Sequence, residues 1–555
     1  MTAWQQNYDP LHSWVLSAIV SALPLATFFY VFLVLKKRVW VAALSGLLAG
    51  FVLALGVFRM PPAMIGISAL LGILIGWLRI AWIIVASIFL YNIAVVTGQF
   101  QVMRGSIARL TADKRLQVIL VGFCFGAFIE GTGGVGTQVA ITGALLVGLG
   151  FPPLQAAKVC LLSNTVPLAW GGIGNPIHVL AGASGLPEQD LSAMTGRILP
   201  LLAAILPLWL VNAMVGWRRT REVLPAVLVS GVSFALIQGF TSNLGHAHWV
   251  DVTAAGGSML AMMALLRIWR PTPIWENEEG VLPGVVPEAQ GAITTLSWMQ
   301  RYPTTTVMRG WSSLLLASVF IFVFGIPQVS QFLSLSVLRQ PVPFLNDMVV
   351  RVPPVVPQPV TEPAIADLNV VAMYGTAVFL GATLSGLLLG LPLRRILRIF
   401  RQTVVRLVHS LLGVSFMVGF LFVLRYSGMI TVMGLALTKT GVAFPFFGTF
   451  VGWLGVALSG ADAVSNSLFG FLQRSTAEQG GLSPVLMAAA NASGGVMGKM
   501  MDPQSILVSS TATQQGGKEG DIFKTVFKHS LLLTTFLGIL VLFYAYFFPG
   551  AIPQR

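Results

Sequence analysis

Long apolar segments recur along the whole chain and limit its fold more than any other feature of the sequence. Segments of roughly 20 apolar residues, enough to cross a bilayer of about 30 Å as a helix, extend from residue 13 to residue 548. Only 9% of the 555 residues are charged, against about 25% in ordinary soluble proteins. The sequence therefore predicts an all-α polytopic membrane protein in a lipid bilayer, with about a dozen crossings.

The basic residues indicate topology rather than nucleic-acid binding. The net charge is +14, but the lysines and arginines form short clusters between apolar segments instead of one patch or stripe. Most clusters fall on one side, which the positive-inside rule makes cytoplasmic. The cluster of Lys36, Lys37 and Arg38 does not, when segments 62–78 and 80–97 are counted as two crossings. Either that count is wrong or the rule fails there.

Two pairs of apolar segments carry glycines, prolines, asparagines and carboxylates that a simple membrane helix avoids. In hydrocarbon, non-helical backbone is tolerated only where protein or a water-filled cavity surrounds it. Segments 115–150 and 443–473 turn at polar, glycine-rich sequence and are expected to be re-entrant hairpins. Segments 155–180 and 484–510 are expected to be broken (discontinuous) transmembrane helices, the kind of element that forms binding sites in transporters.

The same pattern occurs twice in the chain, which predicts an internal duplication. One alignment pairs four positions of the first copy with four of the second: Asn164 with Asn491, Gly171 with Gly498, Asn175 with Asp502, and Pro176 with Pro503. An odd number of predicted crossings between the copies gives two inverted repeats, each with a re-entrant hairpin and a broken helix.

The two repeats divide the chain into halves. The first transmembrane half is predicted at residues 1–270 and the second at 309–555. A cytoplasmic linker is predicted between them at 271–308. The Pro-rich stretch at about 328–368 is predicted to be an external loop with an extended, stiff course.

A small organic anion needs hydrogen-bond donors and a positive potential, and hairpin tips and helix N-termini supply both. For the asparagine and serine side chains, hydrogen bonding between helices is the alternative role. Trp170 either lines the pocket or only packs. The candidate substrate-binding residues are Gly131, Gly133, Gly134, Gly136, Thr137, Gln138, Asn164, Thr165, Trp170, Ser465, Asn466, Asn491, Ser493 and Ser505.

Carboxylates inside apolar segments are candidates for ion coupling, because burial of a charge at membrane depth costs about 2.5–3.5 kcal/mol even on a lenient scale. Proton coupling would use Glu130 and Asp462, one in each hairpin, with Asp502 as a third candidate. Lys499 lies one turn from Asp502 and either acts in the site or only pairs with it. Sodium coupling would instead use unwound carbonyl groups beside Asn175-Pro176 and Asp502-Pro503, and the composition does not choose between the two ions.

The sequence gives no pattern typical of an enzyme or an ATP-driven pump. The six histidines are scattered, and Cys124 and Cys160 have no metal-ligand or redox spacing. A glycine-rich ATP-binding loop with a lysine is also absent from the sequence. We expect no catalytic residues, no metal and no cofactor, and the oligomeric state stays open.

Several longer motifs resemble the lactate permease family of bacterial inner-membrane transporters. They are WQQNYDP near the start, VGFCFGAFIEG, ITGALLVGLGF, NASGGVMGKMMDPQSI, and FKHS near the end. The resemblance covers essentially the whole chain. It implies a multi-pass protein of the bacterial cytoplasmic membrane that imports a short 2-hydroxymonocarboxylate (L-lactate, also D-lactate or glycolate) with a proton.

The chain departs from the family pattern at the predicted site. TGGVGTQVA stands where the family usually reads AAGFGAPVA, which introduces Thr137 and Gln138. NTVPLAWGGIGNPI introduces Trp170 and Asn175, and Arg425 stands where an uncharged residue is usual. These changes leave open an alternative, a sodium-coupled or proton-coupled transporter of a different, larger or more polar organic anion.

Overall fold

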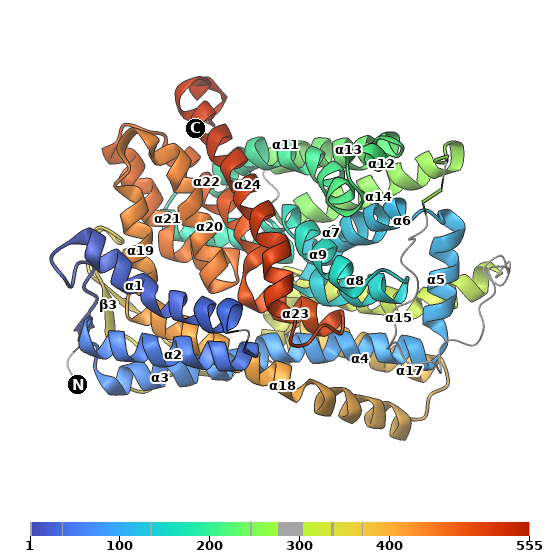
Figure 1. Ribbon diagram of the computed structural model, residues 1–555, viewed down its shortest axis with the longest axis horizontal. Coiled ribbons are helices and arrows are strands. Elements are labelled where there is room, and N and C mark those ends of the chain that lie inside the picture. The colour runs from blue at the N-terminus through green and yellow to red at the C-terminus, as the bar shows by residue number, and fades with distance from the viewer. Residues whose placement is uncertain are drawn as a thin grey trace.

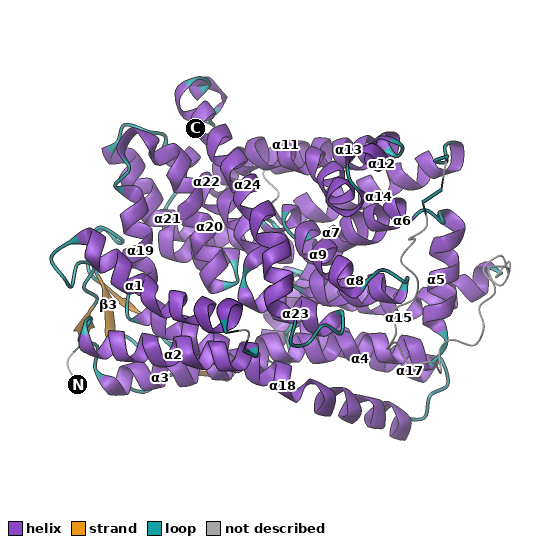
Figure 2. Ribbon diagram, in the orientation of Figure 1, coloured by secondary structure: helices purple, strands orange, loops and turns teal. Residues whose placement is uncertain are grey.

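The computed structural model describes residues 3–35, 37–133, 136–244, 247–272, 274–275, 303–334, 338–368 and 370–553. This part of the chain is almost entirely helical (Figure 2), which confirms the predicted all-α class. Eight of its helices are long and apolar enough to cross a membrane, or up to nine if one bent pair is a single span. Most of the predicted linker at 271–308 lies outside the described residues.

The first half of the chain folds into helices joined by short 3-10 and π-helical stretches. Its α-helices are α1 (Trp14–Phe29), α2 (Val39–Gly56), α3 (Pro62–Ile75), α4 (Trp82–Val96), α5 (Gln99–Leu110), α6 (Lys114–Gln117), α7 (Gly126–Gly133), α8 (Thr137–Gly148), α9 (Pro153–Ser163), α10 (Gly171–Ser184), α11 (Glu188–Val215), α12 (Trp217–Arg221), α13 (Leu224–Asn243) and α14 (Val250–Ile268). The shorter stretches are η1 (Tyr30–Val34), η2 (Gly76–Ala81), η3 (Val118–Phe125), η4 (Val166–Leu168) and η5 (Ala247–Trp249).

The second half has the same helical character. Its α-helices are α15 (Thr304–Gly325), α16 (Pro327–Ser334), α17 (Tyr374–Leu388), α18 (Leu393–Tyr426), α19 (Met429–Thr438), α20 (Phe444–Ser459), α21 (Asp462–Gln479), α22 (Pro484–Gly498), α23 (Pro503–Ala512) and α24 (Glu519–Tyr546). The 3-10 stretches are η8 (Gly441–Ala443), η9 (Lys499–Met501) and η10 (Pro549–Ala551).

Residues 62–96 form one helix, whereas the sequence predicted two crossings there. Helices α3 and α4 join through η2 into a continuous span of 35 residues from Pro62 to Val96. The π-helical geometry of η2 widens the helix by one residue and keeps it unbroken. The predicted count of two crossings was therefore wrong at this point. A count of one crossing there removes the exception that Lys37 and Arg38 made to the positive-inside rule, and the side of the membrane on which they lie stays a prediction.

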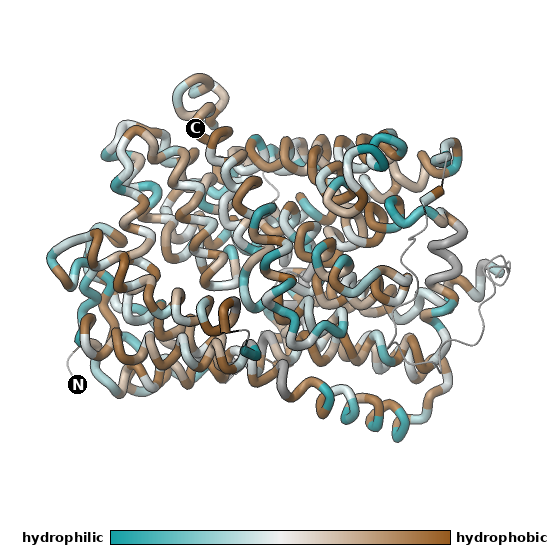
Figure 3. The backbone as a smooth tube through the Cα atoms, in the orientation of Figure 1, coloured by the Kyte–Doolittle hydropathy of each residue, from teal (hydrophilic) through white to brown (hydrophobic). Residues whose placement is uncertain are grey.

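Exposed apolar side chains along the long helices fit a bilayer environment. On α13, Leu236 is 68% exposed and Phe240 is 67% exposed. Figure 3 shows hydrophobic residues along most of the helices, while hydrophilic residues gather at α12 and at one end of α18. Large exposed apolar surfaces are unusual on soluble monomers, whereas lipid chains cover them in a membrane.

The helices surround a central group that contains both predicted hairpins and both predicted broken helices. In Figure 1, α2, α3 and α4 run along one edge of the molecule beside α18, and α11 and α13 lie along the opposite edge. Helices α7 to α9 and α20 to α23 lie between these edges. Helix α18 bends by 55° between its segments Leu393–Val408 and Leu411–Tyr426.

The predicted external loop contains short strands that hold it to the N-terminal segment. Strand β3 (Val349–Arg351) pairs with β4 (Val360–Glu362) and, in parallel, with β1 (Trp4–Gln5), and β2 (Leu338–Pro341) pairs with β5 (Ile365–Leu368). The Gln6 amide donates to the Tyr426 carbonyl at 2.9 Å. Glu362 also forms an ion pair with Arg425 at 2.8 Å. The loop is thus fastened to the end of α18.

At the centre, each hairpin packs against the broken helix of the other half. Helix α8, the second arm of the first hairpin, packs against α23, the second part of the second broken helix. Helix α21, the second arm of the second hairpin, packs against α10, the second part of the first broken helix. Such an exchange of partners is expected of two related copies. Their inverted orientation in the membrane stays a prediction.

Candidate functional site

The first hairpin brings a buried carboxylate to the start of its second arm. Gly136 takes a φ of 79°, a left-handed conformation that suits glycine, and α8 begins at the next residue. Glu130 is fully buried. Its Oε1 accepts a hydrogen bond from the Gly136 N–H at 3.3 Å, and its Oε2 accepts one from the Gln138 N–H at 3.5 Å. The carboxylate therefore lies at the positive end of the α8 dipole, where a negative charge is stabilised.

Gln138 connects the two arms of this hairpin to the first broken helix. Its Nε2 donates to the Gly122 carbonyl at 3.1 Å and to the Ser163 hydroxyl at 2.9 Å. The predicted site residues Gly131 and Thr137 are buried beside it. Gly133 ends α7, and Gly134 lies outside the described residues.

The first broken helix leaves α-helical geometry between Ser163 and Gly171. Asn164 ends α9 and is completely buried, and neither its side-chain nitrogen nor its oxygen has a hydrogen-bond partner. The Thr165 hydroxyl donates to the Leu162 carbonyl at 2.8 Å. The Trp170 indole N–H donates to the Ser192 hydroxyl of α11 at 3.0 Å. Of these predicted residues, Asn164 is the one whose side chain remains available for a ligand.

The second hairpin carries a network of buried amide side chains. Asp462, at the start of α21, is 2% exposed, and its Oδ2 accepts from the Asn466 amide at 3.1 Å. That amide also donates to the Pro176 carbonyl of α10 at 3.1 Å, so the network reaches the other half of the chain. Asn491 donates to Asn466 at 2.9 Å. The Oδ1 of Asp462 has no partner.

Two further amide and hydroxyl contacts complete this network. Asn491 accepts a hydrogen bond from Gln473 at 3.2 Å and donates to the Ser465 hydroxyl at 3.4 Å. Four hydrogen-bonded amide and hydroxyl side chains hold α21 and α22 together, which is the interhelical role considered for these residues. Ser493, also on α22, is fully buried and its hydroxyl has no partner.

The second broken helix ends α22 at Gly498 and restarts as α23 at Pro503. Asp502 is the N-cap residue of α23, since its Oδ1 accepts from the backbone N–H groups of Gln504 at 2.8 Å and Ser505 at 3.0 Å. The Ser505 hydroxyl is buried without a partner. The break thus begins a new helix inside the protein, and the Ser505 hydroxyl beside its N-terminus is left without a partner.

Lys499 lies where the tips of the two hairpins meet. Its ammonium donates to the Gly460 carbonyl at the second hairpin tip at 2.6 Å and lies 3.4 Å from the Asp502 carboxylate. A Cβ placed on Gly136, at the first hairpin tip, would be 4.0 Å from the Lys499 Nζ. The same ammonium acts electrostatically on Glu130 and Asp462. All three predicted coupling carboxylates therefore share one buried cation.

The aligned positions of the two copies do not occupy equivalent local structures. Asn164 stands at a helix end, whereas Asn491 lies within α22. Asn175 is exposed within α10, whereas Asp502 is a buried N-cap. The breaks fall at different points of the repeat, so the copies contribute different groups to the centre.

Sequence reasoning missed two residues of this region. Asp251 on α14 is buried against the first hairpin, and Gln473 on α21 belongs to the amide network. Asp251 lies near the predicted start of an apolar segment, where a carboxylate ordinarily reaches the interface. No local signal marked either residue, because their burial depends on helices distant in sequence.

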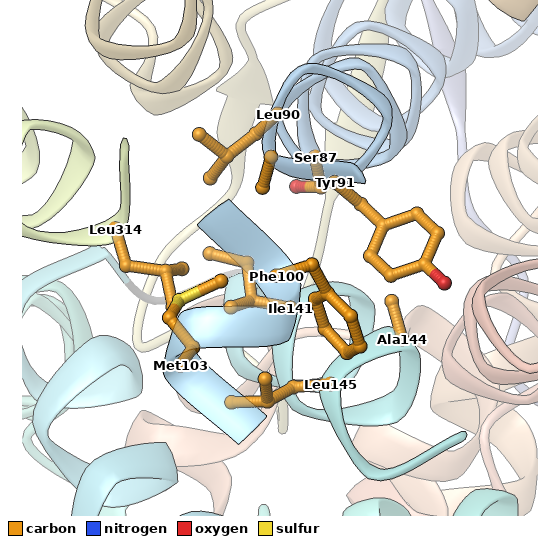
Figure 4. A pocket seen from close by; sticks show the side chains of 10 residues that line it. Ser87, Leu90, Tyr91, Phe100, Met103, Ile141, Ala144, Leu145 and Leu314 are labelled. Atoms are coloured by element: carbon orange, nitrogen blue, oxygen red, sulfur yellow. The ribbon is translucent and has the colours of Figure 1, made fainter. Parts of the chain in front are cut away.

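Three cavities near these elements differ in size and polarity. A cavity of about 520 Å³ extends from the external loop and Arg425 to the second hairpin tip at Gly460 and to Gln504. A second cavity, shown in Figure 4, is apolar, lies between α4, α5, α8 and α15, and has a volume of about 20 Å³. That volume holds about one water molecule. A third cavity, of about 790 Å³, is lined mainly by apolar residues of η3, α7, α14 and α15. Of the three, the first contains a charged side chain, Arg425, and reaches the second hairpin tip, which suits it to a small organic anion.

A model of the L-lactate permease family matches residues 17–548. The chain belongs to the L-lactate permease family. This confirms the resemblance read from the motifs, and membership of a permease family makes the chain a membrane transporter and not an enzyme.

Similar members of the L-lactate permease family align with the chain from end to end. The glycolate permease GlcA of Escherichia coli (strain K12) is 40% identical and covers 99% of both chains. The L-lactate permease of Salmonella typhimurium is 39% identical over 100% of both chains. The L-lactate permease of Bacillus subtilis (strain 168) is 38% identical over 99% of this chain and 100% of its own.

Among solved structures, the YdaH transporter of Alcanivorax borkumensis aligns with 87% of this chain and 89% of its own. The identity is 14% and the TM-score is 0.30. A TM-score of this size carries no argument about the fold.

Proposed function

We propose that this chain imports a short 2-hydroxymonocarboxylate (L-lactate, also D-lactate or glycolate) with a proton across the bacterial cytoplasmic membrane. The names of its relatives support the substrate class, since glycolate and L-lactate permeases match it equally well over its full length. Glycolate and lactate share a carboxylate next to a carbon that carries a hydroxyl. The site must therefore bind one anionic group and one neutral polar group.

Lys499 is the group proposed to bind the substrate carboxylate, and this is the observation that carries the proposal. An ammonium has three N–H donors. One donates to the Gly460 carbonyl, and the Asp502 carboxylate lies 3.4 Å away as an ion pair without a hydrogen bond. The other N–H groups can donate to a ligand. Because Lys499 is 3% exposed, a charge-assisted hydrogen bond there is stronger than it would be in water.

Unpartnered polar side chains on the broken helices are proposed to complete the site. Asn164, Ser493 and Ser505 are buried, and each has a side-chain atom without a hydrogen bond. A buried polar group left unsatisfied costs about 1–3 kcal/mol, and a substrate carboxylate or hydroxyl would recover that energy. Helix α9, whose C-cap is Asn164, packs against both η9 and α23, the elements that carry Lys499 and Ser505.

The remaining predicted substrate residues support the site mainly through the backbone and through packing. Gly131, Gly136, Thr137 and Thr165 form the first tip and the first break. Ser465, Asn466 and Asn491 hold the second hairpin to its broken helix, with their side chains already hydrogen-bonded to one another. Gly133 and Gly134 remain proposed contributors at the first tip.

The carboxylates Glu130 and Asp462 are proposed to couple the proton, one in each hairpin. Glu130 faces backbone N–H groups of the first tip, and Asp462 has one oxygen without a partner. Asp502 caps α23 and pairs with Lys499, so its main proposed role is to position the ammonium. Protonation of Glu130 or Asp462 would remove a negative charge near Lys499, which makes the potential there more positive and favours binding of the anionic substrate.

The departures from the family pattern favour a small substrate over a larger one. Gln138 uses both hydrogens of its amide nitrogen within the protein, on Gly122 and Ser163. Trp170 uses its indole N–H on Ser192. Neither side chain therefore offers an N–H group to an extra polar group of a larger anion.

The test is uptake of labelled L-lactate and glycolate by proteoliposomes that contain the purified protein. An inward proton gradient is expected to drive accumulation, and a sodium gradient alone is not. Cys124→Ala serves as the folding and transport control, because Cys124 contacts Ser258 away from the site, and it should transport like the wild type. Accumulation driven by sodium, or by neither ion in inserted protein, would refute the proposal.

A further inference from the structure

Helix α14 places a second carboxylate directly against the first hairpin. Asp251 is the second residue of α14 and is 1% exposed. A Cβ placed on Gly131 would lie 3.0 Å from the Asp251 Cβ and 3.2 Å from the Val252 nitrogen. Any larger residue at position 131 would push α14 away, so the glycine lets Asp251 approach the residue that follows Glu130.

The surroundings of Asp251 satisfy its carboxylate only in part. The Gln238 amide of α13 donates to Asp251 Oδ1 at 3.1 Å. The backbone N–H of Trp170, at the break of the first broken helix, also interacts with the carboxylate. The other oxygen, Oδ2, is buried and has no hydrogen-bond partner. An ionised carboxylate seeks several donors in such a place, whereas a carboxylic acid needs fewer.

The charged neighbour of Asp251 is another carboxylate. Glu130 acts on it electrostatically from α7. The segment that forms α13 contains no titratable residue. On η3, the Cys124 thiol contacts the Ser258 hydroxyl, about two turns along α14 from Asp251. On η5 His248 is exposed, and on α10 His178 is exposed and pairs with Glu188 at 3.0 Å.

Two buried carboxylates close enough to interact do not both ionise readily, and such a pair holds a proton in common. The Lys499 ammonium compensates Glu130 and is not among the groups that act on Asp251. In this pair, Glu130 interacts with a cation and, within the described part of the chain, Asp251 does not. Asp251 also contacts the first hairpin, the first broken helix and α13.

We propose that Asp251 binds the transported proton, as the partner of Glu130 in a carboxyl pair beneath the first hairpin. The inference rests on the proposed proton-coupled import and deepens it. A proton from water on the outer side forms one O–H bond on the carboxylate, and that bond breaks when the proton leaves to water inside. No other bond changes, and the charge moved with the substrate anion is balanced by the proton.

The deciding variant is Asp251→Asn, which keeps the size of the side chain and removes the proton-binding group. Two assays use the same proteoliposomes: accumulation of labelled L-lactate under an inward proton gradient, and exchange of external labelled for internal unlabelled L-lactate without a gradient. Exchange moves substrate both ways and needs no net proton transfer. We expect Asp251→Asn to lose accumulation and to retain exchange.

Asp190→Asn is the matched control, because Asp190 is a buried carboxylate in the first turn of α11, outside the pair. It should keep both activities. Wild-type accumulation in Asp251→Asn would overturn the inference and leave the proposed function standing. Loss of exchange as well, in a variant that elutes and unfolds like the wild type, would also overturn it. Failure of the wild-type protein to accumulate lactate with protons would overturn the proposed function instead, and the inference with it.

Gln238→Leu gives a second test that leaves both carboxylates in place. Gln238 donates to the Asp251 carboxylate, and loss of that donor favours the protonated acid over the anion. The pH at which uptake is half-maximal should therefore move upward, with the maximal rate retained. An unchanged pH profile in a variant that transports would count against Asp251 as the proton-binding group.

Discussion

Replacement of Lys499 by methionine removes the charge that the two hairpin tips and three carboxylates share. The side chain keeps its length and loses its contacts with Gly460 and Asp502. Removal of one partner of a buried ion pair leaves an uncompensated charge and costs about 3–5 kcal/mol of stability. Lys499→Met is therefore expected to unfold at a clearly lower temperature than the wild type in detergent, as measured by thermal denaturation.

Lys499→Met should also weaken substrate binding, and this effect is independent of the loss of stability. A hydrogen bond to a charged group contributes about 1.5–3 kcal/mol. At about 1.4 kcal/mol per factor of ten, the loss corresponds to a KM for L-lactate raised about 10- to 100-fold. The assay is the concentration dependence of exchange in proteoliposomes, because exchange does not depend on the proton gradient.

A double variant separates the two effects. In Lys499→Met with Asp502→Asn, both members of the ion pair lose their charge, so Asp502 is not left charged without its partner, and asparagine is as good an N-cap as aspartate. Most of the lost stability should return, while the raised KM should persist. Lys158→Met is the matched control, since Lys158 is also a lysine of a broken helix but donates to the Ala213 carbonyl at 2.8 Å. A wild-type KM in Lys499→Met would refute the assignment of Lys499 to the substrate.

Three shorter predictions test other parts of the structure. Glu130→Gln should remain folded and lose the accumulation of labelled L-lactate that an inward proton gradient drives in proteoliposomes. Retained accumulation would exclude Glu130 from coupling. Gly452→Ala should destabilise the protein, because its Cβ would overlap the carbonyl oxygen of Asn491, and thermal denaturation would show this as a lowered midpoint. Glu362→Gln should loosen the external loop, since it removes the charged partner of Arg425, and faster cleavage in limited proteolysis would reveal it. A cleavage rate equal to the wild type would show that the strands alone hold the loop.

The sequence could predict where the helices break, because breaks have local causes. Pro503 has no backbone N–H and therefore cannot donate the hydrogen bond that would continue the preceding helix. Asp502 before it is a good N-cap residue, so a new helix begins at Pro503. Gly460, with a φ of 72°, ends α20 in the same local way. Side chains within a few residues of each break decide these features, and a single sequence contains that information.

The sequence could not predict which groups meet across the two halves. The sequence places Lys499 one turn from Asp502 and leaves open whether it acts in the site or only pairs with Asp502, and this local spacing contains no information about Glu130. Asp251 reaches Glu130 because α14 packs on α7, a contact between residues about 120 positions apart in the chain. The sequence also did not predict the continuous helix from Pro62 to Val96, because hydropathy does not distinguish a π-helical stretch from a turn.

The charges at the centre favour binding of the proposed substrate together with a proton. Glu130, Asp251, Asp462 and Asp502 are buried there, and Lys499 acts on three of them. A lactate anion that entered with all four carboxylates ionised would add a fifth negative charge around one ammonium. In a low-dielectric site that arrangement is strongly unfavourable, and a proton bound at the Glu130–Asp251 pair relieves it. The affinity for the anion and the affinity for the proton must then rise together, since binding free energies are linked reciprocally. Accordingly, the apparent affinity for L-lactate should rise as the outer pH falls, and Asp251→Asn should abolish most of that dependence.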